Sequence, residues 1–353
     1  MSERYLPAEW FPQDAVLITW PHVDSDWAEN LADAEDVYLD LLSALSHTQD
    51  VLIQIHSSVD VDRLFVLFER DGINQARCHL VMVDSNDTWA RDHGPVTVIE
   101  AGQPILLNFE FNGWGGKFDA RLDTELNQIM ADGAIFDAPM ESISWVLEGG
   151  SIESDGQGTL MTTSACLLTP NRNGQQTRAT VEQKLKNWFG ADRVLWLETG
   201  ALSGDDTDAH IDTLARFAPD STLVYQGCQD ESDEHFGALS AMKIELEGFT
   251  NSAGEPYRLV ELPWPEARFG KDGQRLPATY ANFLVTNQLV LTPTYGASQD
   301  GAALEKLANA FPGHRVVGIP CRTLIEQYGS LHCITMQLPK GTLSRLLIDA
   351  RDI

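Results

Sequence analysis

Short strand-like runs alternate with amphipathic helical stretches along all 353 residues, and this order constrains the fold more than any other feature. Apolar residues with helical spacing predict helices over 31–47, 60–70, 121–131, 179–189, 236–247 and 302–311. Between these stretches lie β-branched runs such as AVLITW, VLIQIH, TLVYQ and RVVGIP. From about residue 95 the order is strand, strand, helix, strand, and it starts again near 158, 212 and 281.

A fifth unit is expected from the two ends of the chain, where the run HCITMQL can join the N-terminal strand, helix and strand. The result is roughly five ββαβ units of about 50–70 residues, a spacing typical of repeat architectures. We therefore predict an α/β fold of five pseudo-symmetric units, forming a single catalytic domain over 1–353, because no linker divides the sequence. An open α/β sheet without symmetry is the alternative.

Charge and cysteine content exclude several classes of protein. The chain has 24 Lys+Arg against 52 Asp+Glu, a formal charge of −28, which disfavours nucleic acid and anionic membranes as partners. The acidity fits either a soluble surface or a small cationic substrate. Five widely spaced cysteines without a CxxC pair indicate neither a disulfide framework nor a zinc knuckle. With no secretory leader and no membrane-length apolar run, a cytoplasmic location is expected.

Two segments place a carboxylate next to a sharp turn. In NDTWARDHGPV, Asp92 lies just before a Gly-Pro break, with Trp89 near enough in sequence to offer an aromatic face to a cation. In WVLEGGSIESDG, Glu148 precedes two glycines, which allow the backbone to approach a ligand closely. Taken alone, each carboxylate is equally consistent with an ordinary turn.

The segment GDDTDAHIDTLARF contains a histidine with a carboxylate two residues later. On an extended strand His210 and Asp212 share one face, and such a pair can hold and transfer a proton near neutral pH. Asp205, Asp206 and Asp208 nearby would also suit a metal ion. A reaction that uses a cysteine as its nucleophile needs no metal, and a candidate cysteine lies near the C-terminus. We therefore predict neither a metal nor a cofactor in this site.

The segment YGSLHCITMQL contains Cys333 directly after His332. If 331–337 is a strand, the two side chains point to opposite faces, and His332 cannot act as the base for Cys333. His210 is then the predicted partner of the thiol. The alternative is a buried, inert cysteine.

These polar positions share a place in the repeat, because each falls at or just before the start of a strand pair. They are Asp92, Glu148, His210 with Asp212, Asn282 of YANFLVTN, and Cys333. Units arranged around an axis would bring equivalent positions together. One central polar cavity is therefore expected.

The segments WARDHGP, LEGGSIESDGQGTL, HIDTLARF, YANF and GSLHCITMQLP resemble the agmatine deiminase/bacterial-type peptidylarginine deiminase family of the guanidine-modifying superfamily. The resemblance runs almost from end to end and implies a five-bladed α/β-propeller. It implies hydrolysis of a guanidinium group through a cysteine, most simply agmatine to N-carbamoylputrescine and ammonia, as in putrescine and polyamine metabolism. A deiminase of arginine or peptidylarginine, an amidinotransferase and an inactive guanidine-binding protein remain open, as does a homodimer.

The resemblance also implies residue roles. Asp92 matches the carboxylate that binds the guanidinium, Glu148 the acidic partner of the histidine, His210 and Asp212 the His-x-Asp pair, and Cys333 the nucleophile. Substrate contacts are expected from Trp89, Trp114 of FNGWGGKF, Asp206, Asn282 and Gly329. Two departures concern the substrate: YGSLHC replaces a Gly-Gly-Asn lead-in, and Asp206 replaces a glutamate. Arg91, Arg172 and Arg216 are the arginines considered for a substrate carboxylate.

Overall fold

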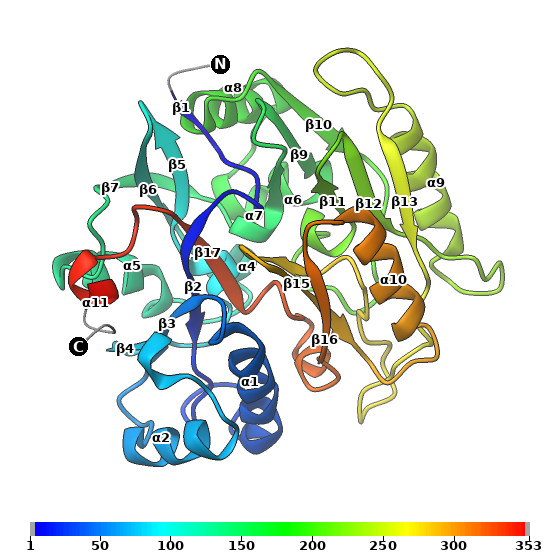
Figure 1. Ribbon diagram of the computed structural model, residues 1–353. Coiled ribbons are helices and arrows are strands. Elements are labelled where there is room, and N and C mark those ends of the chain that lie inside the picture. The colour runs from blue at the N-terminus through cyan, green and yellow to red at the C-terminus, as the bar shows by residue number, and fades with distance from the viewer. Residues whose placement is uncertain (1–3, 350–353) are drawn as a thin grey trace. The chain divides into compact units, whose positions relative to one another are not determined.

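The computed structural model describes residues 4–349, and its contacts divide the chain into two compact units. We call 10–149 with 333–349 the cysteine unit, after Cys333. We call 4–9 with 150–332 the histidine unit, after His210. Each unit contains sheets, helices and buried apolar side chains. Figure 1 labels the helices and strands and colours them along the chain.

The first sheet of the cysteine unit joins the C-terminal strand to the N-terminal part of the chain. Its order is β17 (Thr335–Pro339), β2 (Gln13–Thr19), β3 (Asp50–Ile55) and β4 (Cys78–Met82). β17 is antiparallel to β2, whereas β2, β3 and β4 are parallel. The parallel strands are connected through α1 (Leu31–Leu45), α2 (Val61–Arg70) and the short η1 (Gln75–Arg77).

The second sheet of this unit has an antiparallel pair followed by a parallel strand. It contains β5 (Val96–Glu100), β6 (Gln103–Glu110) and β7 (Met140–Val146), with η2 (Asp123–Glu125) and α5 (Leu126–Asp132) as the crossover. Three short helices complete the unit: α3 (Ala90–His93), α4 (Gly113–Gly116) and α11 (Arg345–Asp349). α3 and α4 come directly before β5 and shortly after β6, and they carry residues of the predicted site.

The histidine unit repeats the same order three times. The three sheets are β8 (Ile152–Ser154), β9 (Thr159–Thr163) and β10 (Arg193–Leu197); β11 (Ala215–Ala218), β12 (Thr222–Gln226) and β13 (Arg258–Leu262); and β14 (Leu284–Val285), β15 (Leu289–Thr294) and β16 (Arg315–Pro320). The crossover helices are α8 (Arg178–Phe189), α9 (Phe236–Glu247) and α10 (Asp300–Ala310), of which α9 and α10 are plain in Figure 1. Shorter elements are β1 (Arg4–Tyr5), η3 (Gly149–Ser151), α6 (Ser164–Leu167), α7 (Pro170–Asn173), η4 (Ile211–Thr213) and η5 (Leu324–Gln327).

Local chemistry explains where the helices begin and end. The Asp60 side chain accepts a hydrogen bond from the Arg63 N–H at 3.1 Å and caps α2. Thr177 caps α8 in the same way, and Gly190 ends that helix with a left-handed φ of 60°. Between such signals, apolar residues at helical spacing are buried, as Val181, Leu185 and Phe189 are in α8.

The structure confirms the α/β class and the strand, strand, helix, strand order. The strands between residues 4 and 349 form five separate sheets, so the alternative of a single open sheet is wrong. The predicted helix over 121–131 is instead η2 followed by the shorter α5. Strands β7, β8, β11 and β13 were not predicted as separate runs, because they are short or mix polar with apolar residues.

No helix in the part of the chain described here is both long and apolar enough to cross a membrane.

Candidate active site

The predicted site residues divide between the two units. Those in the cysteine unit are Trp89, Asp92, Trp114, Glu148 and Cys333; those in the histidine unit are Asp206, His210, Asp212, Asn282 and Gly329. All are buried except Asp206 and Gly329, which are half-buried. Buried polar groups need hydrogen-bonding or charged partners, and these partners fix the arrangement of the site residues within each unit.

In the cysteine unit, Asp92 is held by a tryptophan. Asp92 lies in α3, and the indole Nε1 of Trp114 donates a hydrogen bond to its Oδ2 at 2.9 Å. Trp114 itself has a left-handed φ of 55°, which is rare for a bulky side chain. A Cβ on the neighbouring Gly113 would lie 2.3 Å from the Phe118 carbonyl oxygen, so this tight loop requires glycine. The Gly-rich segment thus orients Trp114 toward Asp92.

Cys333 lies next to Asp92 through the backbone. The Arg91 N–H donates to the Cys333 carbonyl oxygen at 3.0 Å, and the Arg91 Nη1 donates to Gln337 Oε1 at 2.6 Å. Gly149, one residue after Glu148, approaches this segment so closely that a Cβ would lie 2.3 Å from the Arg91 carbonyl oxygen. Gly149 therefore allows the chain after Glu148 to approach the backbone of Arg91 closely.

Replacement of Trp114 by phenylalanine tests its role in holding Asp92. Loss of a hydrogen bond to a charged group costs about 1.5–3 kcal/mol, so we expect kcat/KM to fall about 10- to 100-fold. Trp196→Phe is the matched control, because the Trp196 indole N–H has no hydrogen-bond partner among the described residues. Equal activities of the two variants in a steady-state assay would exclude this role for Trp114.

In the histidine unit, His210 precedes a turn of 3₁₀ helix. The prediction that His210 and Asp212 share one face of a strand is wrong, because η4 covers Ile211–Thr213. The Thr213 Oγ1 donates to the His210 carbonyl oxygen at 2.8 Å, and the His210 N–H donates to Thr207 Oγ1 at 3.1 Å. These local bonds favour a tight turn over an extended strand.

Two of the acids before His210 are used by the protein itself. Asp205 accepts hydrogen bonds from the Thr207 hydroxyl at 2.6 Å and from the Ala209 N–H at 2.6 Å. Asp208 pairs with the buried Arg172 at 2.7 Å. Asp205 and Asp208 therefore stabilise the loop, while Asp206 is half-buried.

Asp212 belongs to a buried network of charged side chains. His332 Nδ1 lies 2.7 Å from Asp212 Oδ2, and its Nε2 lies 2.7 Å from Glu9 Oε2. The His332 Nε2 also lies 3.0 Å from Arg216 Nη2, so this ring is surrounded by charged groups. Arg216 donates to Glu9 at 2.6 Å and also pairs with Glu153. We call Glu9, Glu153, Asp212, Arg216 and His332 the buried charge network.

The network keeps Asp212 ionised. Burial would raise the pKa of Asp212, but the hydrogen bond from His332 and the charges of His332, His210 and Arg216 hold that pKa below its ordinary value. The pKa of Glu153 is raised by its burial, against the opposing charge of Arg216. Asp212 is therefore a fixed anion at neutral pH, suited to binding a cation.

Asn282 connects the network to the next sheet. Its Nδ2 donates to the Asp212 carbonyl oxygen at 3.4 Å, and its Oδ1 accepts from the His332 N–H at 2.9 Å. Asn282 thus joins the backbones of 212 and 332, which are distant in sequence. In the histidine unit the structure brings together Asp212, Asn282 and His332.

The segment around Cys333 corrects the predicted strand over 331–337. Residues 331–334 form a turn, and β17 begins at Thr335. His332 and Cys333 therefore do not lie on opposite faces of a strand, contrary to the prediction. Both ring nitrogens of His332 face carboxylates.

Sequence reasoning missed most of the buried charge network. Arg216 had a usable signal, since a charged residue inside the apolar run LARFA needs a buried partner. Glu9 had none, because its partner His332 is 323 residues away. The three arginines considered for a substrate carboxylate all have protein partners: Gln337 for Arg91, Asp208 for Arg172, and Glu9 with Glu153 for Arg216.

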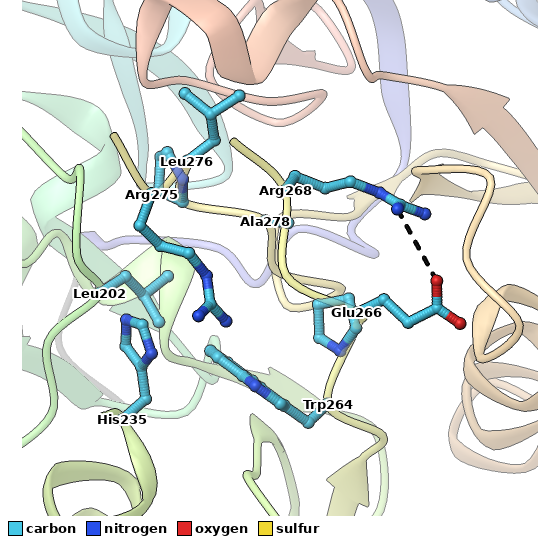
Figure 2. A pocket seen from close by; sticks show the side chains of 10 residues that line it. Leu202, His235, Trp264, Glu266, Arg268, Arg275, Leu276 and Ala278 are labelled. Carbon is cyan, nitrogen blue, oxygen red and sulfur yellow. Dashed lines mark ion pairs between the residues drawn. The ribbon is translucent and has the colours of Figure 1, made fainter. Parts of the chain in front are cut away.

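A separate shallow pocket lies on the histidine unit (Figure 2). It is lined by ten residues, among them His235, Trp264, Arg268 and Arg275. Arg275 pairs with Asp233 at 2.9 Å and Arg268 lies 3.7 Å from Glu266. None of the predicted site residues lines this pocket.

Comparison with known proteins identifies the family. The profile of the Porphyromonas-type peptidyl-arginine deiminase family matches residues 5–339. A protein of Shewanella sp. (strain MR-7), named "Putative agmatine deiminase", is 32% identical over 96% of this chain and 94% of its own.

Solved structures agree with this match. The "Putative Arginine Deiminase" from Porphyromonas gingivalis is 43% identical, with a TM-score of 0.89 over 96% of this chain and 99% of its own. The C. jejuni agmatine deiminase with substrate bound is 36% identical, with a TM-score of 0.88 over 96% of this chain and 97% of its own. The chain therefore belongs to the Porphyromonas-type peptidyl-arginine deiminase family, and it is an agmatine deiminase-like hydrolase that acts on C–N bonds.

Proposed function

We propose that this protein hydrolyses the guanidinium group of agmatine to give N-carbamoylputrescine and ammonia, with Cys333 as the nucleophile. The observation that carries the proposal is the backbone hydrogen bond from Arg91 to Cys333, which joins the segment that carries Asp92 to the residue that carries the thiol. A carboxylate next to a sulfur can hold a planar cation with its carbon near the nucleophile. The names of several relatives support the same reaction class.

The proposed reaction needs the residues of both units in one site. Asp92 and Asp212 bind the NH groups of the guanidinium through charge-assisted hydrogen bonds. We propose, from the likeness to solved deiminases, that the chain acts as one catalytic domain with a five-bladed α/β-propeller fold. The high TM-scores to solved deiminases along the whole chain support this arrangement. The free state of all five cysteines fits a reducing compartment such as the cytoplasm.

The chemistry proceeds in two halves. The thiolate of Cys333 adds to the guanidinium carbon, His210 gives a proton to the departing nitrogen, and the C–N bond breaks to release ammonia. The remaining S-alkylthiouronium is attacked by water, which loses a proton to His210, oriented by Glu148. Collapse of this adduct breaks the C–S bond and restores the thiolate, the hydroxyl proton passes to solvent or to ammonia, and the neutral ureido product is released.

The choice of agmatine rests on charge. Agmatine carries a cation at each end, and Asp206 in the acid-rich loop is a candidate for the distal ammonium. Free arginine would bring a carboxylate toward the same loop, and the three arginines considered for it are bonded to protein groups. The names of the relatives give different substrates, so the substrate preference of this protein is measured directly.

A substrate panel provides that comparison. We expect kcat/KM for agmatine to exceed that for free arginine and for an arginine-containing peptide by at least about 100-fold. Free arginine brings an unpaired carboxylate, and the peptide brings backbone amides in place of the ammonium that Asp206 would bind. The measurement is ammonia release from each compound without an added amine. A preference for the peptide would assign peptidylarginine as the substrate. Turnover only when an acceptor amine is added would instead indicate amidinotransfer, and binding without turnover a guanidine-binding protein.

A further inference from the structure

A cluster of histidines and carboxylates lies at one edge of the first sheet of the cysteine unit, and the proposed reaction does not use it. His22 follows β2, His56 directly follows β3, and Asp84 follows β4. These strands are parallel, so their carboxyl ends meet at the same edge of the sheet. Ligand sites in α/β sheets favour this edge.

The side chains of the cluster are close enough to share one ion. The rings of His22 and His56 are stacked, with centroids 4.1 Å apart and planes 6° apart. One nitrogen of each ring and one oxygen of Asp24 all lie within 4.8 Å of one another. His56 Nδ1 is 3.9 Å from Asp24 Oδ2, and His56 Nε2 is 3.5 Å from Asp84 Oδ1.

His22 gives the cluster a buried nitrogen without a protein partner. The residue is 1% exposed, and its Nε2 lies 3.2 Å from the Ser85 hydroxyl. Its Nδ1 has no hydrogen-bond partner within residues 4–349. A buried polar atom without a hydrogen bond destabilises the folded state, and native proteins rarely keep one without a role.

We propose that His22, His56 and Asp24 bind a divalent first-row transition ion. Two imidazoles and a carboxylate suit zinc, cobalt or nickel better than calcium or magnesium, which prefer oxygen ligands. Neighbouring ligand atoms in a tetrahedral zinc site are about 3.3 Å apart, so the cluster has to contract around the ion. The rings of His22 and His56 are stacked, so the His56 ring also has to rotate until the in-plane lone pairs of both rings point to the ion.

The side chains that must move are near solvent. His56 Nδ1 accepts a hydrogen bond from the Ser58 N–H at 3.1 Å, which an ion at that nitrogen would displace. The Asp24 and Asp84 side chains are 63% and 50% exposed, so the ion has a path from solvent. Bound there, it would join the ends of β2 and β3.

Zinc titration of the full chain tests the proposal. The measurement uses Cys333→Ser protein stripped with a chelator, because this background removes the thiol of the proposed active site as a competing ligand. We expect one zinc ion per chain with a Kd of about 10 μM or lower, and at least about 10-fold weaker binding in both His56→Ala and Asp24→Asn. His47→Ala is the control, since His47 is an exposed histidine outside the cluster, and it should bind zinc unchanged.

Two results would overturn the proposal. The first is a failed zinc titration. Either the parent protein does not bind zinc below about 100 μM, or its Kd is unchanged when His56 and Asp24 are replaced. The other comes from cobalt substitution, because a thiolate-to-metal charge-transfer band in the near ultraviolet would place the ion on a cysteine instead of the cluster. Substitutions at His56 and the exposed Asp24 keep the test independent of folding defects at the buried His22.

Discussion

Replacement of Cys333 by serine is expected to lower kcat by at least about 10³-fold, because a hydroxyl has no anionic form at neutral pH and the covalent route is lost. The fold should be unaffected, since the Cys333 carbonyl oxygen, which the substitution keeps, makes the hydrogen bond to Arg91. The measurement is steady-state ammonia release from agmatine, with circular dichroism to verify folding.

Cys78→Ser supplies the matched control. Burial first, and the nearby Asp50, raise the pKa of the Cys78 thiol to about 12, so this thiol is inert at neutral pH. Its replacement should leave kcat unchanged. In the wild-type protein an alkylating reagent should modify Cys333 before the other cysteines, and agmatine should slow that modification. Full activity in Cys333→Ser would remove the nucleophile from the proposed mechanism.

Replacement of Arg216 by methionine is expected to destabilise the protein by about 3–5 kcal/mol, the usual cost of leaving a buried charge without its partner. Arg216 is 1% exposed and pairs with both Glu9 and Glu153. It also donates to the Phe283 carbonyl oxygen at 2.6 Å, and its guanidinium carbon lies 4.7 Å from the centre of the Phe283 ring. The loss should appear as a lower midpoint in urea unfolding.

Two comparisons isolate the charge effect. Arg121→Met removes an exposed arginine paired with Asp119 and should leave the urea midpoint unchanged. Adding Glu9→Gln and Glu153→Gln to Arg216→Met should recover part of the lost stability, because no buried anion then lacks a cation. If the triple variant is no more stable than Arg216→Met, the loss comes from packing, and unpaired charge is not its cause.

The sequence predicted the larger elements well because their signals are local. α1, α2, α8, α9 and α10 combine apolar periodicity with end signals such as Asp60 and Gly190, which act within one turn. The strand over 331–337 failed because HCITMQL has strand-like composition throughout, while its first residues are held in a turn by contacts distant in sequence. Alternation of side chains cannot reveal such contacts.

The site was predictable only in part, for the same reason. Asp212 could be named from its spacing to His210, but its ionisation depends on His332, 120 residues away. Trp114 was expected near the substrate, but its hydrogen bond to Asp92 had no signal in the sequence. The acids at 205–208 were considered as metal ligands, and a metal was not predicted there; the donors that Asp205 and Asp208 satisfy were not foreseen. Each of these partners is one that local sequence does not specify.

One peptide bond connects two differently anchored residues. His332 is fixed by Asp212 and Glu9 in the histidine unit, whereas the Cys333 carbonyl is fixed by Arg91 in the cysteine unit. In the proposed mechanism, a change in either set of contacts would shift the Cys333 sulfur and leave every reacting group in place. A conservative exchange at Glu9, near the start of the chain, is therefore expected to alter turnover, and directed evolution of this enzyme should include that position.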